Sequence, residues 1–234
     1  DMPVPSRVGT ELNMDNIVQR AAGDTSRDKL YDCSQTIARG GRIVAVSADM
    51  SGSMTEKQVK MAIAAIAEAA DMVGDDFLAT CWTQTRTSRG GYEVKREDTG
   101  IGVVCDHEEP FEWSQLDAFD TGGGTPTADG IDITVQLIEN VQAREKLLLV
   151  VTDGTPNSVY GDGASSLTGC PVRDAREVVQ KIRSKNIRVI GLFVGESAEE
   201  TAMADIFGAD GYVEASMDDL AQELLDVYRE QLRV

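Results

Sequence analysis

Four runs of mainly apolar residues divide the chain, and each has the length of a β-strand. They lie at residues 42–48 (RIVAVSA), 76–83 (DFLATCWT), 146–152 (KLLLVVT) and 187–194 (IRVIGLFV). Because apolar residues follow one another with little alternation, both faces of each strand should be covered, as in parallel sheets. A short strand is also predicted at residues 211–214. Residues 85–124 fit this rhythm poorly and are expected to hold an antiparallel edge strand and surface loops.

Segments with a helical period separate these strands. The clearest is residues 55–73, where Val59, Ile63 and Ile66 recur at a spacing close to 3.6 residues. Thr55 and Gln58 have the spacing of a capping box, which would start this helix. Further helices are predicted at residues 127–141, 171–182, 197–207 and 217–232, the last with Ser216 as its cap.

Alternating strands and helices imply right-handed crossovers between parallel strands. The predicted fold class is therefore α/β, with a doubly wound, mostly parallel, Rossmann-like sheet that carries helices on both faces. We assign residues 42–234 to this single domain. Residues 1–41 have weak periodicity and are interpreted as an N-terminal preamble or linker.

The charge of the chain narrows its possible partners. There are 40 acidic and 22 basic residues, which gives a formal net charge of −18. Such a surface repels the phosphates of nucleic acids and anionic membranes, so neither is expected as a partner. Arg outnumbers Lys by 15 to 7. This composition fits either an ordinary acidic protein or a protein adapted to a high-salt cytoplasm.

Several reactive or aromatic residues have simple structural interpretations. Cys33, Cys81, Cys105 and Cys170 show no CxxC pairing, which predicts reduced thiols, and Cys105 with His107 forms only a weak metal-binding pair. Trp82 and Trp113 are interpreted as packing residues. The single histidine has no nucleophile and base around it, so the chain is not expected to be an enzyme. No apolar run reaches the length of a membrane span, and the first residues do not show a basic segment followed by an apolar stretch and a cleavage site, so we expect a cytoplasmic protein.

Oxygen-bearing side chains follow the predicted strands in three segments. These are DMSGS at residues 49–53, TGGGT at residues 121–125, and TDG at residues 152–154. Ligands of open α/β sheets bind at the carboxyl ends of the strands, near the point where strand order reverses. We therefore expect one site to be formed by Asp49, Ser51, Ser53, Thr125 and Asp153.

This set of side chains matches the preferences of a magnesium-type ion. Mg²⁺ takes near-octahedral oxygen ligands and usually keeps some waters. Three of the five donors are neutral hydroxyls, so the ion would remain electrophilic and could accept a further carboxylate. No P-loop pattern accompanies Gly122 to Gly124, and these glycines are interpreted as allowing Thr125 to approach the ion.

The three segments together resemble the metal-ion-dependent adhesion site of von Willebrand factor A domains. The resemblance covers roughly residues 40–233. It implies that Ser51 and Ser53 bind Mg²⁺ or Mn²⁺ directly, that Thr125 binds directly or through water, and that Asp49 and Asp153 act directly or through water. It also implies that a protein partner completes the coordination with a Glu or Asp. The adjacent second site of integrin β-type domains is not predicted, because Thr55-Glu56-Lys57 occupies the place of its two acids.

Two kinds of partner remain open. Arg7, Gly9 and Leu12, with Gly23 and Asp24 further on, resemble the preamble of cobaltochelatase-like and nitric-oxide-reductase-activation-like proteins. This resemblance implies an intracellular adaptor that works with an AAA+ ATPase of the MoxR or chelatase type. The alternative is an extracellular or cell-surface adhesin whose metal captures an acidic residue of its ligand.

Overall fold

A six-stranded sheet forms the centre of the molecule in the computed structural model, which describes residues 2–6, 11–12, 31–35, 41–87, 96–154, 156, 170–194 and 200–232. The strands are β4 (Arg42–Asp49), β5 (Asp76–Thr87), β6 (Arg96–Cys105), β7 (Glu145–Thr152), β8 (Arg188–Phe193) and β9 (Tyr212–Glu214). Their order is β6-β5-β4-β7-β8-β9, and all neighbours are parallel except β5 and β6. The predicted α/β fold class is therefore confirmed, including the antiparallel edge strand.

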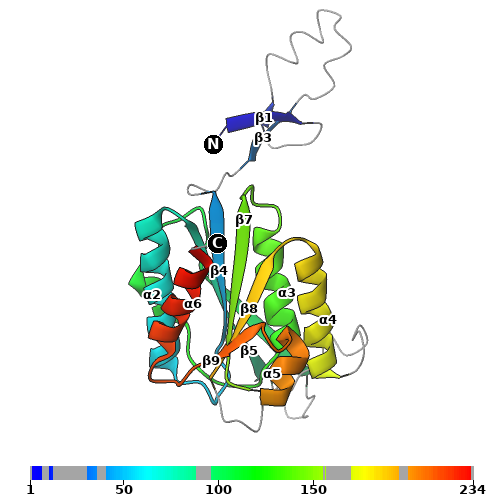
Figure 1. The fold of residues 1–234 in the computed structure, drawn as a ribbon. Coiled ribbons are helices and arrows are strands. Elements are labelled where there is room, and N and C mark those ends of the chain that lie inside the picture. The colour runs from blue at the N-terminus through cyan, green and yellow to red at the C-terminus, as the bar shows by residue number, and fades with distance from the viewer. Residues whose placement is uncertain are drawn as a thin grey trace, which may run out of the picture.

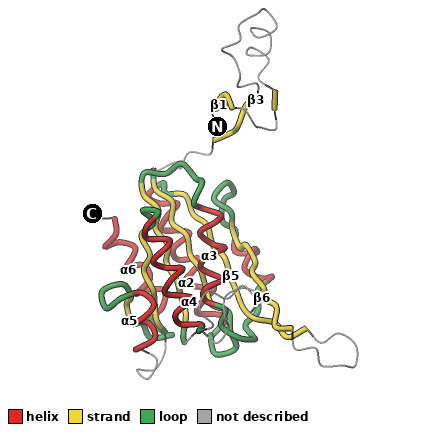
Figure 2. The backbone as a smooth tube through the Cα atoms, turned by 90° about the vertical axis from the view of Figure 1, so that its right-hand side faces the viewer, coloured by secondary structure: helices red, strands yellow, loops and turns green. Residues whose placement is uncertain are grey.

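Helices cover both faces of this sheet (Figure 1). They are α2 (Glu56–Val73), the 3₁₀ helix η1 (Trp113–Ala118), α3 (Thr127–Ile138), α4 (Pro171–Ser184), α5 (Glu200–Phe207) and α6 (Leu220–Leu232). Helices α2 and α6 pack on one face, and α3, α4 and α5 pack on the other. Figure 2 shows helices on both sides of the strands in a view turned by 90°.

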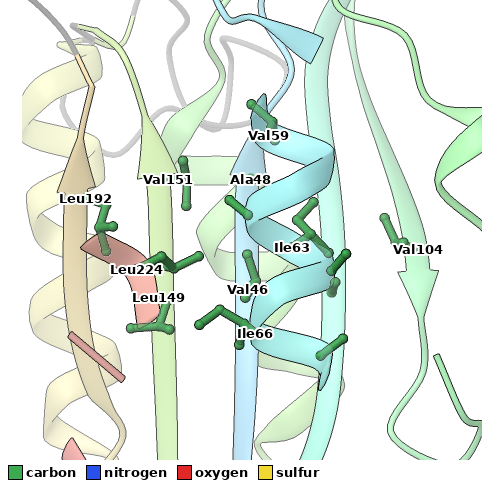
Figure 3. Close-up of a cluster of buried hydrophobic side chains, with 14 of the residues drawn as sticks. Val46, Ala48, Val59, Ile63, Ile66, Val104, Leu149, Val151, Leu192 and Leu224 are labelled. Atoms are coloured by element: carbon green, nitrogen blue, oxygen red, sulfur yellow. The ribbon is translucent and has the colours of Figure 1, made fainter. Parts of the chain in front are cut away.

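The continuous apolar runs supply two separate cores. Along β4, Val44, Val46 and Ala48 face α2 and α6, whereas Ile43 and Ala45 face α3 and α4. Figure 3 shows the first core, where Val46 and Ala48 of β4 lie beside Ile63 and Ile66 of α2, and Leu149 of β7 lies beside Leu224 of α6. Successive residues of a strand point to opposite faces, so a strand covered on both sides needs apolar residues at every position.

The predicted boundaries differ from the structure at a few places. Strand β5 extends to Thr87, four residues beyond the prediction, because it pairs with the edge strand β6. Thr55 does occupy the N-cap of α2, but its side chain makes no capping hydrogen bond, so the predicted capping box is wrong. Ser216 does cap the last helical segment, since its Oγ accepts the Asp219 N–H at 3.1 Å. Residues 195–199, which include the predicted start of α5, lie outside the described residues.

The N-terminal segment contains three short strands that the sequence did not predict. Strands β1 (Met2–Ser6), β2 (Glu11–Leu12) and β3 (Tyr31–Gln35) form an antiparallel sheet in the order β1-β3-β2. Of the predicted preamble motif, Arg7, Gly9, Gly23 and Asp24 lie outside the described residues. Within the described part of the chain, no helix is both long and apolar enough to cross a membrane.

Candidate metal-binding site

Asp49 lies at the centre of the candidate site, at the end of β4. Its side chain is fully buried, and both oxygens accept hydrogen bonds. Oδ1 accepts the Ser51 N–H at 2.8 Å, and Oδ2 accepts the Thr152 hydroxyl at 2.8 Å. Thr152 ends β7, the parallel neighbour of β4. The carboxylate is thus held at the point where the chain winds to either side of the sheet, which is the switch point of the fold.

The two serines extend this arrangement toward Asp153. Ser51 is buried and Ser53 is exposed, and their Oγ atoms lie 3.4 Å apart. The Ser53 hydroxyl donates a hydrogen bond to the Asp153 carboxylate. The β4–α2 turn and the end of β7 therefore bring four of the five predicted side chains into one connected group.

The glycine-rich segment before α3 places Thr125 beside the same turn. Gly122 N–H donates to the Met50 carbonyl at 2.8 Å, and Gly52 N–H donates to the Gly123 carbonyl at 3.2 Å. On its other side the segment pairs with the end of β5, where Gln84 and Gly124 exchange two backbone hydrogen bonds of 3.1 Å. Thr125 follows directly and is buried.

Gly123 is the glycine that this loop requires. Its φ is +77°, and a Cβ at this position would lie 1.7 Å from the Gln84 carbonyl oxygen. The sequence interpretation placed the need for glycine at the ion. The structure instead places it at the backbone of β5, and this close approach is what positions the segment that carries Thr125.

Burial raises the pKa of both carboxylates, and repulsion by Asp153 adds to the shift at Asp49. Burial raises the pKa of Asp49 to about 7, and the negative charge of Asp153 adds to the effect, while hydrogen bonds from Ser51 and Thr152 oppose it. Burial also raises the pKa of Asp153, and the Ser53 hydroxyl opposes this shift. Two carboxylates at one place, one fully buried and one partly buried, are energetically costly unless a cation compensates their charge. The donors present, two carboxylates and neighbouring hydroxyls, suit a hard divalent cation.

Thr152 is a contributor that the sequence interpretation did not assign. It lies inside the quoted TDG segment, so its position at a strand end was the available signal. Its hydroxyl donates to Asp49 and is itself 3.5 Å from the Gly154 N–H. Thr152 therefore orients the carboxylate of Asp49.

Other residues singled out in the sequence lie apart from this site. His107 Nδ1 is 2.6 Å from Asp106 Oδ1, and the Cys105 thiol contacts backbone carbonyls. Cys81, Cys105 and Cys170 are free thiols, as predicted, and the side chain of Cys33 lies outside the described residues. Among the residues that the structure describes, no three His, Cys, Asp or Glu side chains form a metal cluster.

The interpretation of the two tryptophans as packing residues is correct for one of them. Trp82 is buried, and its Nε1 donates to Ser47 Oγ at 2.9 Å. Trp113 is 55% exposed, although it makes an edge contact with Phe111 at a centroid distance of 6.1 Å. Its place on η1, outside the central sheet, explains the difference.

Residues 114–229 match the family model of the von Willebrand factor type A domain. The chain contains a von Willebrand factor A domain. The matched range runs from η1 through α6, and the fold agrees with solved A domains. The chain is similar to the vWF domain of the type V pili tip protein Mfa5 from Porphyromonas gingivalis, with a TM-score of 0.59, 12% identity, and coverage of 85% of this chain and 95% of that chain.

The A domain is also similar to a mussel byssus protein and to curated bacterial relatives. Proximal thread matrix protein 1, in a structure whose MIDAS motif is occupied by zinc, aligns with a TM-score of 0.53 and 15% identity over 83% of this chain and 48% of that chain. Protein NorD of Brucella melitensis biotype 1 is 26% identical over 235 residues, covering 94% of this chain and 35% of the relative. The chain thus spans about a third of the length of the curated relatives it matches.

Proposed function

We propose that this A domain is a metal-dependent protein-interaction module, in which Asp49, Ser51, Ser53, Thr125 and Asp153 hold one Mg²⁺ or Mn²⁺ ion. The observation that carries the proposal is the connected group of Asp49, Ser51, Ser53 and Asp153 at the switch point of the sheet. Oxygen donors of this kind are the ligands that hard divalent cations prefer. The zinc-occupied MIDAS motif of the mussel protein supports a metal role for the corresponding place in this fold.

The partner is proposed to bind through a Glu or Asp side chain at the ion. Hydroxyl ligands donate little negative charge, so the ion retains affinity for an additional carboxylate. Ser53 is the exposed member of the group, which leaves this side of the site open to a partner. Metal and partner should therefore bind cooperatively, each increasing the affinity of the other by the same factor.

We further propose that the module is a cytoplasmic adaptor without catalytic activity that works with an AAA+ ATPase of the MoxR or chelatase type. The alignment with NorD leaves only 6% of the chain unmatched, so it must include much of the 41-residue preamble. This extent supports an adaptor of the NorD kind, in agreement with the resemblance of the preamble motif. The group of hydroxyls and carboxylates at the site contains no histidine and no cysteine, which supports a binding role.

Calorimetric titration with MgCl₂ and MnCl₂ tests the metal site. The parent should bind one ion, and Asp49→Ala and Ser53→Ala should lose at least about tenfold in affinity, because each removes an oxygen ligand. Thr55→Ala is the matched control, since it removes a nearby exposed hydroxyl that makes no capping hydrogen bond. Equal metal binding by the parent and Asp49→Ala would show that the site is assigned wrongly.

Purification of partners from the native host, with Mg²⁺ or with chelator, tests the interaction itself. Binding constants of the identified partner are then measured for the parent, Thr125→Ala and Asp153→Ala. We expect chelator and both variants to weaken binding, and we expect the partner to be an AAA+ ATPase. If affinity in chelator equals affinity in Mg²⁺, recognition does not use the metal, and the proposed function fails even though the fold is correct.

A further inference from the structure

A second candidate binding site lies at the opposite end of the strands from the candidate metal-binding site. The chain enters β4 at the upper end of the sheet in Figure 1, so the strand ends that carry Asp49 and Asp153 lie at the lower end. A cavity of about 540 Å³ opens where β4, β7 and β8 begin. We call it the basic cavity, because it is lined by Arg42, Arg144, Lys146, Arg183 and Arg188.

The lining of this cavity is mainly positive, whereas the chain as a whole is negative. Five of the 22 basic residues line it, together with only two acidic residues, Glu145 and Asp210. The chain as a whole carries a net charge of −18. A positive cavity in a strongly acidic protein is not explained by general surface composition.

Three of the cations are held by neutral oxygen atoms. Arg183 donates from its two terminal nitrogens to the carbonyls of Phe207 at 2.8 Å and Val189 at 3.0 Å. Lys146 Nζ donates to the Glu139 carbonyl at 2.5 Å, and Arg188 donates to the Gln231 side-chain oxygen. Among described residues, no carboxylate lies within ion-pair distance of these three side chains.

These contacts orient the cations without neutralising them. Burial lowers the pKa of Arg183 and of Lys146, and the nearby Glu139 carboxylate opposes the shift at Lys146. By contrast, Arg42 pairs with Glu145 at 2.6 Å and with Asp75 at 3.4 Å. Arg144 also pairs with Glu145, at 3.0 Å. The cavity therefore combines two arginines that pair with acids and three fixed cations whose charge is available to an anion.

The spacing of the cations favours several carboxylates over one compact anion. Arg42 on β4 is opposite Glu145 on β7, and Leu147 on β7 is opposite Arg188 on β8. Neighbouring strands lie about 4.8 Å apart, so Arg42 and Arg188, two strands apart on the same face, are separated by roughly 10 Å, and Lys146 on β7 points to the other face of the sheet. A compact anion cannot contact cations this far apart at once, whereas acidic side chains on one face of an extended peptide repeat about every 6.6 Å and can contact separate cations from successive positions.

The lining does not have the usual features of a nucleotide site. No aromatic side chain is among the described lining residues, so a base would lack a stacking surface. Helices α4 and α6 reach the cavity, and both do so with their C-terminal ends, through Arg183 and Gln231. Helix N-termini attract phosphate, whereas C-termini carry a negative partial charge. We propose that the basic cavity binds an acidic peptide segment of a protein partner, independently of the metal-binding site.

The test uses a fluorescein-labelled hexaglutamate peptide, its hexaglutamine counterpart, and fluorescence anisotropy in chelator at 50 mM KCl. We expect the hexaglutamate peptide to bind and the hexaglutamine peptide not to bind. The affinity should fall at least about tenfold at 500 mM KCl, because salt screens the ion pairs. Equal binding of the two peptides, or no binding of either, would overturn the proposal.

Charge variants locate the site on the molecule. Arg183→Gln should weaken hexaglutamate binding at least fivefold. The double variant Arg144→Gln/Arg188→Gln should do the same, and both of its positions are exposed, so it keeps the test decisive if Arg183→Gln does not fold. Arg176→Gln is the matched control, because it removes one exposed arginine of α4 that does not line the cavity. If the double variant binds as the control does, the cavity is not the site.

Two further measurements distinguish this proposal from binding at the metal site and from binding of phosphate ligands. Asp49→Ala should bind hexaglutamate as the parent does, so failure of the metal site and failure of the basic cavity give different results. Inorganic tripolyphosphate and unlabelled hexaglutamate are compared as competitors, each added at the same total concentration of negative charge. Weaker competition by tripolyphosphate supports an acidic peptide, whereas stronger competition would reassign the cavity to phosphate ligands.

Discussion

The environment of Asp49 is unfavourable for a negative charge in the absence of a cation. Asp49 is fully buried, yet it lies in the same group as a second carboxylate, Asp153. Ser51 and Thr152 fix both of its oxygens, so the side chain cannot turn away to reduce the repulsion. The protein thus maintains an arrangement that is unfavourable without a cation, which is the expected property of a preorganised metal site.

The pKa of Asp49 leads to a pH-dependent stability in chelator. Its folded-state pKa is about 7, above the ordinary value of 3.8. Below pH 4 the group is protonated in both states, and as pH rises toward 7 only the folded state still holds the proton, so stability is lost across this window. We expect Asp49→Asn to avoid this loss. Its melting temperature minus that of the parent should therefore increase between pH 4 and pH 7 in EDTA.

Magnesium supplies the control for this measurement. Saturating Mg²⁺ at pH 8 should stabilise the parent and leave Asp49→Asn almost unchanged, because bound cation compensates the carboxylate. A difference between the two proteins that stays constant from pH 4 to pH 8 would contradict the assigned role of burial at Asp49.

Gly123 and Gly122 are adjacent glycines, and we expect substitution by alanine to be harmful at Gly123 and tolerated at Gly122. Gly123→Ala forces a non-glycine residue to φ near +77° and places its Cβ against the Gln84 carbonyl. We expect a loss of at least about 2 kcal/mol in unfolding free energy or a displaced loop with weakened metal affinity. Gly122→Ala has open space within 4 Å and should change stability by less than about 0.5 kcal/mol. Chemical denaturation and metal titration of both variants measure the contrast, and equal behaviour would refute it.

The sequence predicted the candidate ligands better than the residues that support them. Asp49, Ser51, Ser53 and Asp153 are oxygen-bearing residues directly after strands, and local order alone indicates that they meet. The contact of Gly123 with Gln84 joins residues 39 positions apart, and no local pattern encodes it. Thr55 shows the opposite error, because capping-box spacing permits a hydrogen bond that tertiary packing does not form.

At the scale of elements, two buried polar networks attach helices to the sheet. On one face, Thr134 of α3 contacts Thr80 Oγ1 at 2.7 Å and Ser47 Oγ at 3.0 Å, and Ser47 also accepts the Trp82 N–H. Gly130 lets α3 lie against Trp82, since a Cβ there would be 2.5 Å from the indole ring. The helix that follows Thr125 is thus fixed to the strands, which restricts any movement in the site to the glycine segment before it.

The apolar pattern predicted the strands and helices of the domain, but it did not predict β1, β2 or β3. Strands β4, β7 and β8 are buried on both faces and therefore have a continuous apolar sequence. Among the described strands, those of the N-terminal sheet pair only with one another, and segments such as Tyr31–Gln35 (YDCSQ) have neither a continuous apolar run nor a clear alternation. Pairing between distant polar segments does not require a hydrophobic pattern, so the sequence gives little indication of it.

The second network attaches α6 and gives a prediction at this scale. The Tyr228 hydroxyl donates to Asp75 Oδ2 at 2.7 Å, and both side chains are buried. Burial and the Asp75 carboxylate raise the pKa of Tyr228, so the hydroxyl remains a donor at all physiological pH values. Tyr228→Phe should lower the unfolding free energy by about 1–3 kcal/mol, because a buried carboxylate loses a donor.

Urea denaturation measures this loss, with Arg229→Ala as the control on the same helix. Arg229 pairs with Asp226 at 3.0 Å on the surface, and both side chains are more than half exposed. Such a pair contributes less than about 1 kcal/mol. A Tyr228→Phe variant no less stable than Arg229→Ala would show that the hydroxyl does not anchor α6.

At the scale of the whole molecule, charge is distributed unevenly between the two ends of the sheet. The end with the candidate metal site contains Asp49 and Asp153, and the opposite end contains the basic cavity. Partners of different chemistry could therefore bind at the two ends at once, one through a metal and the other through its own acidic side chains. Such an arrangement is consistent with the adaptor role proposed above.

The net charge of −18 leads to the final prediction, which concerns salt. Like charges that are crowded by folding repel one another, and salt reduces this repulsion, since the Debye length falls from about 10 Å at 0.1 M to about 3 Å at 1 M. We expect KCl to raise the melting temperature, measured in chelator so that metal binding does not contribute. The increase should be steepest below about 0.5 M if screening causes it, whereas exclusion of salt from the surface would act mainly at molar concentrations. Sucrose, which is excluded but does not screen charge, is the control. A melting temperature that is insensitive to KCl, or that falls, would remove the interpretation of this composition as adaptation to a high-salt cytoplasm.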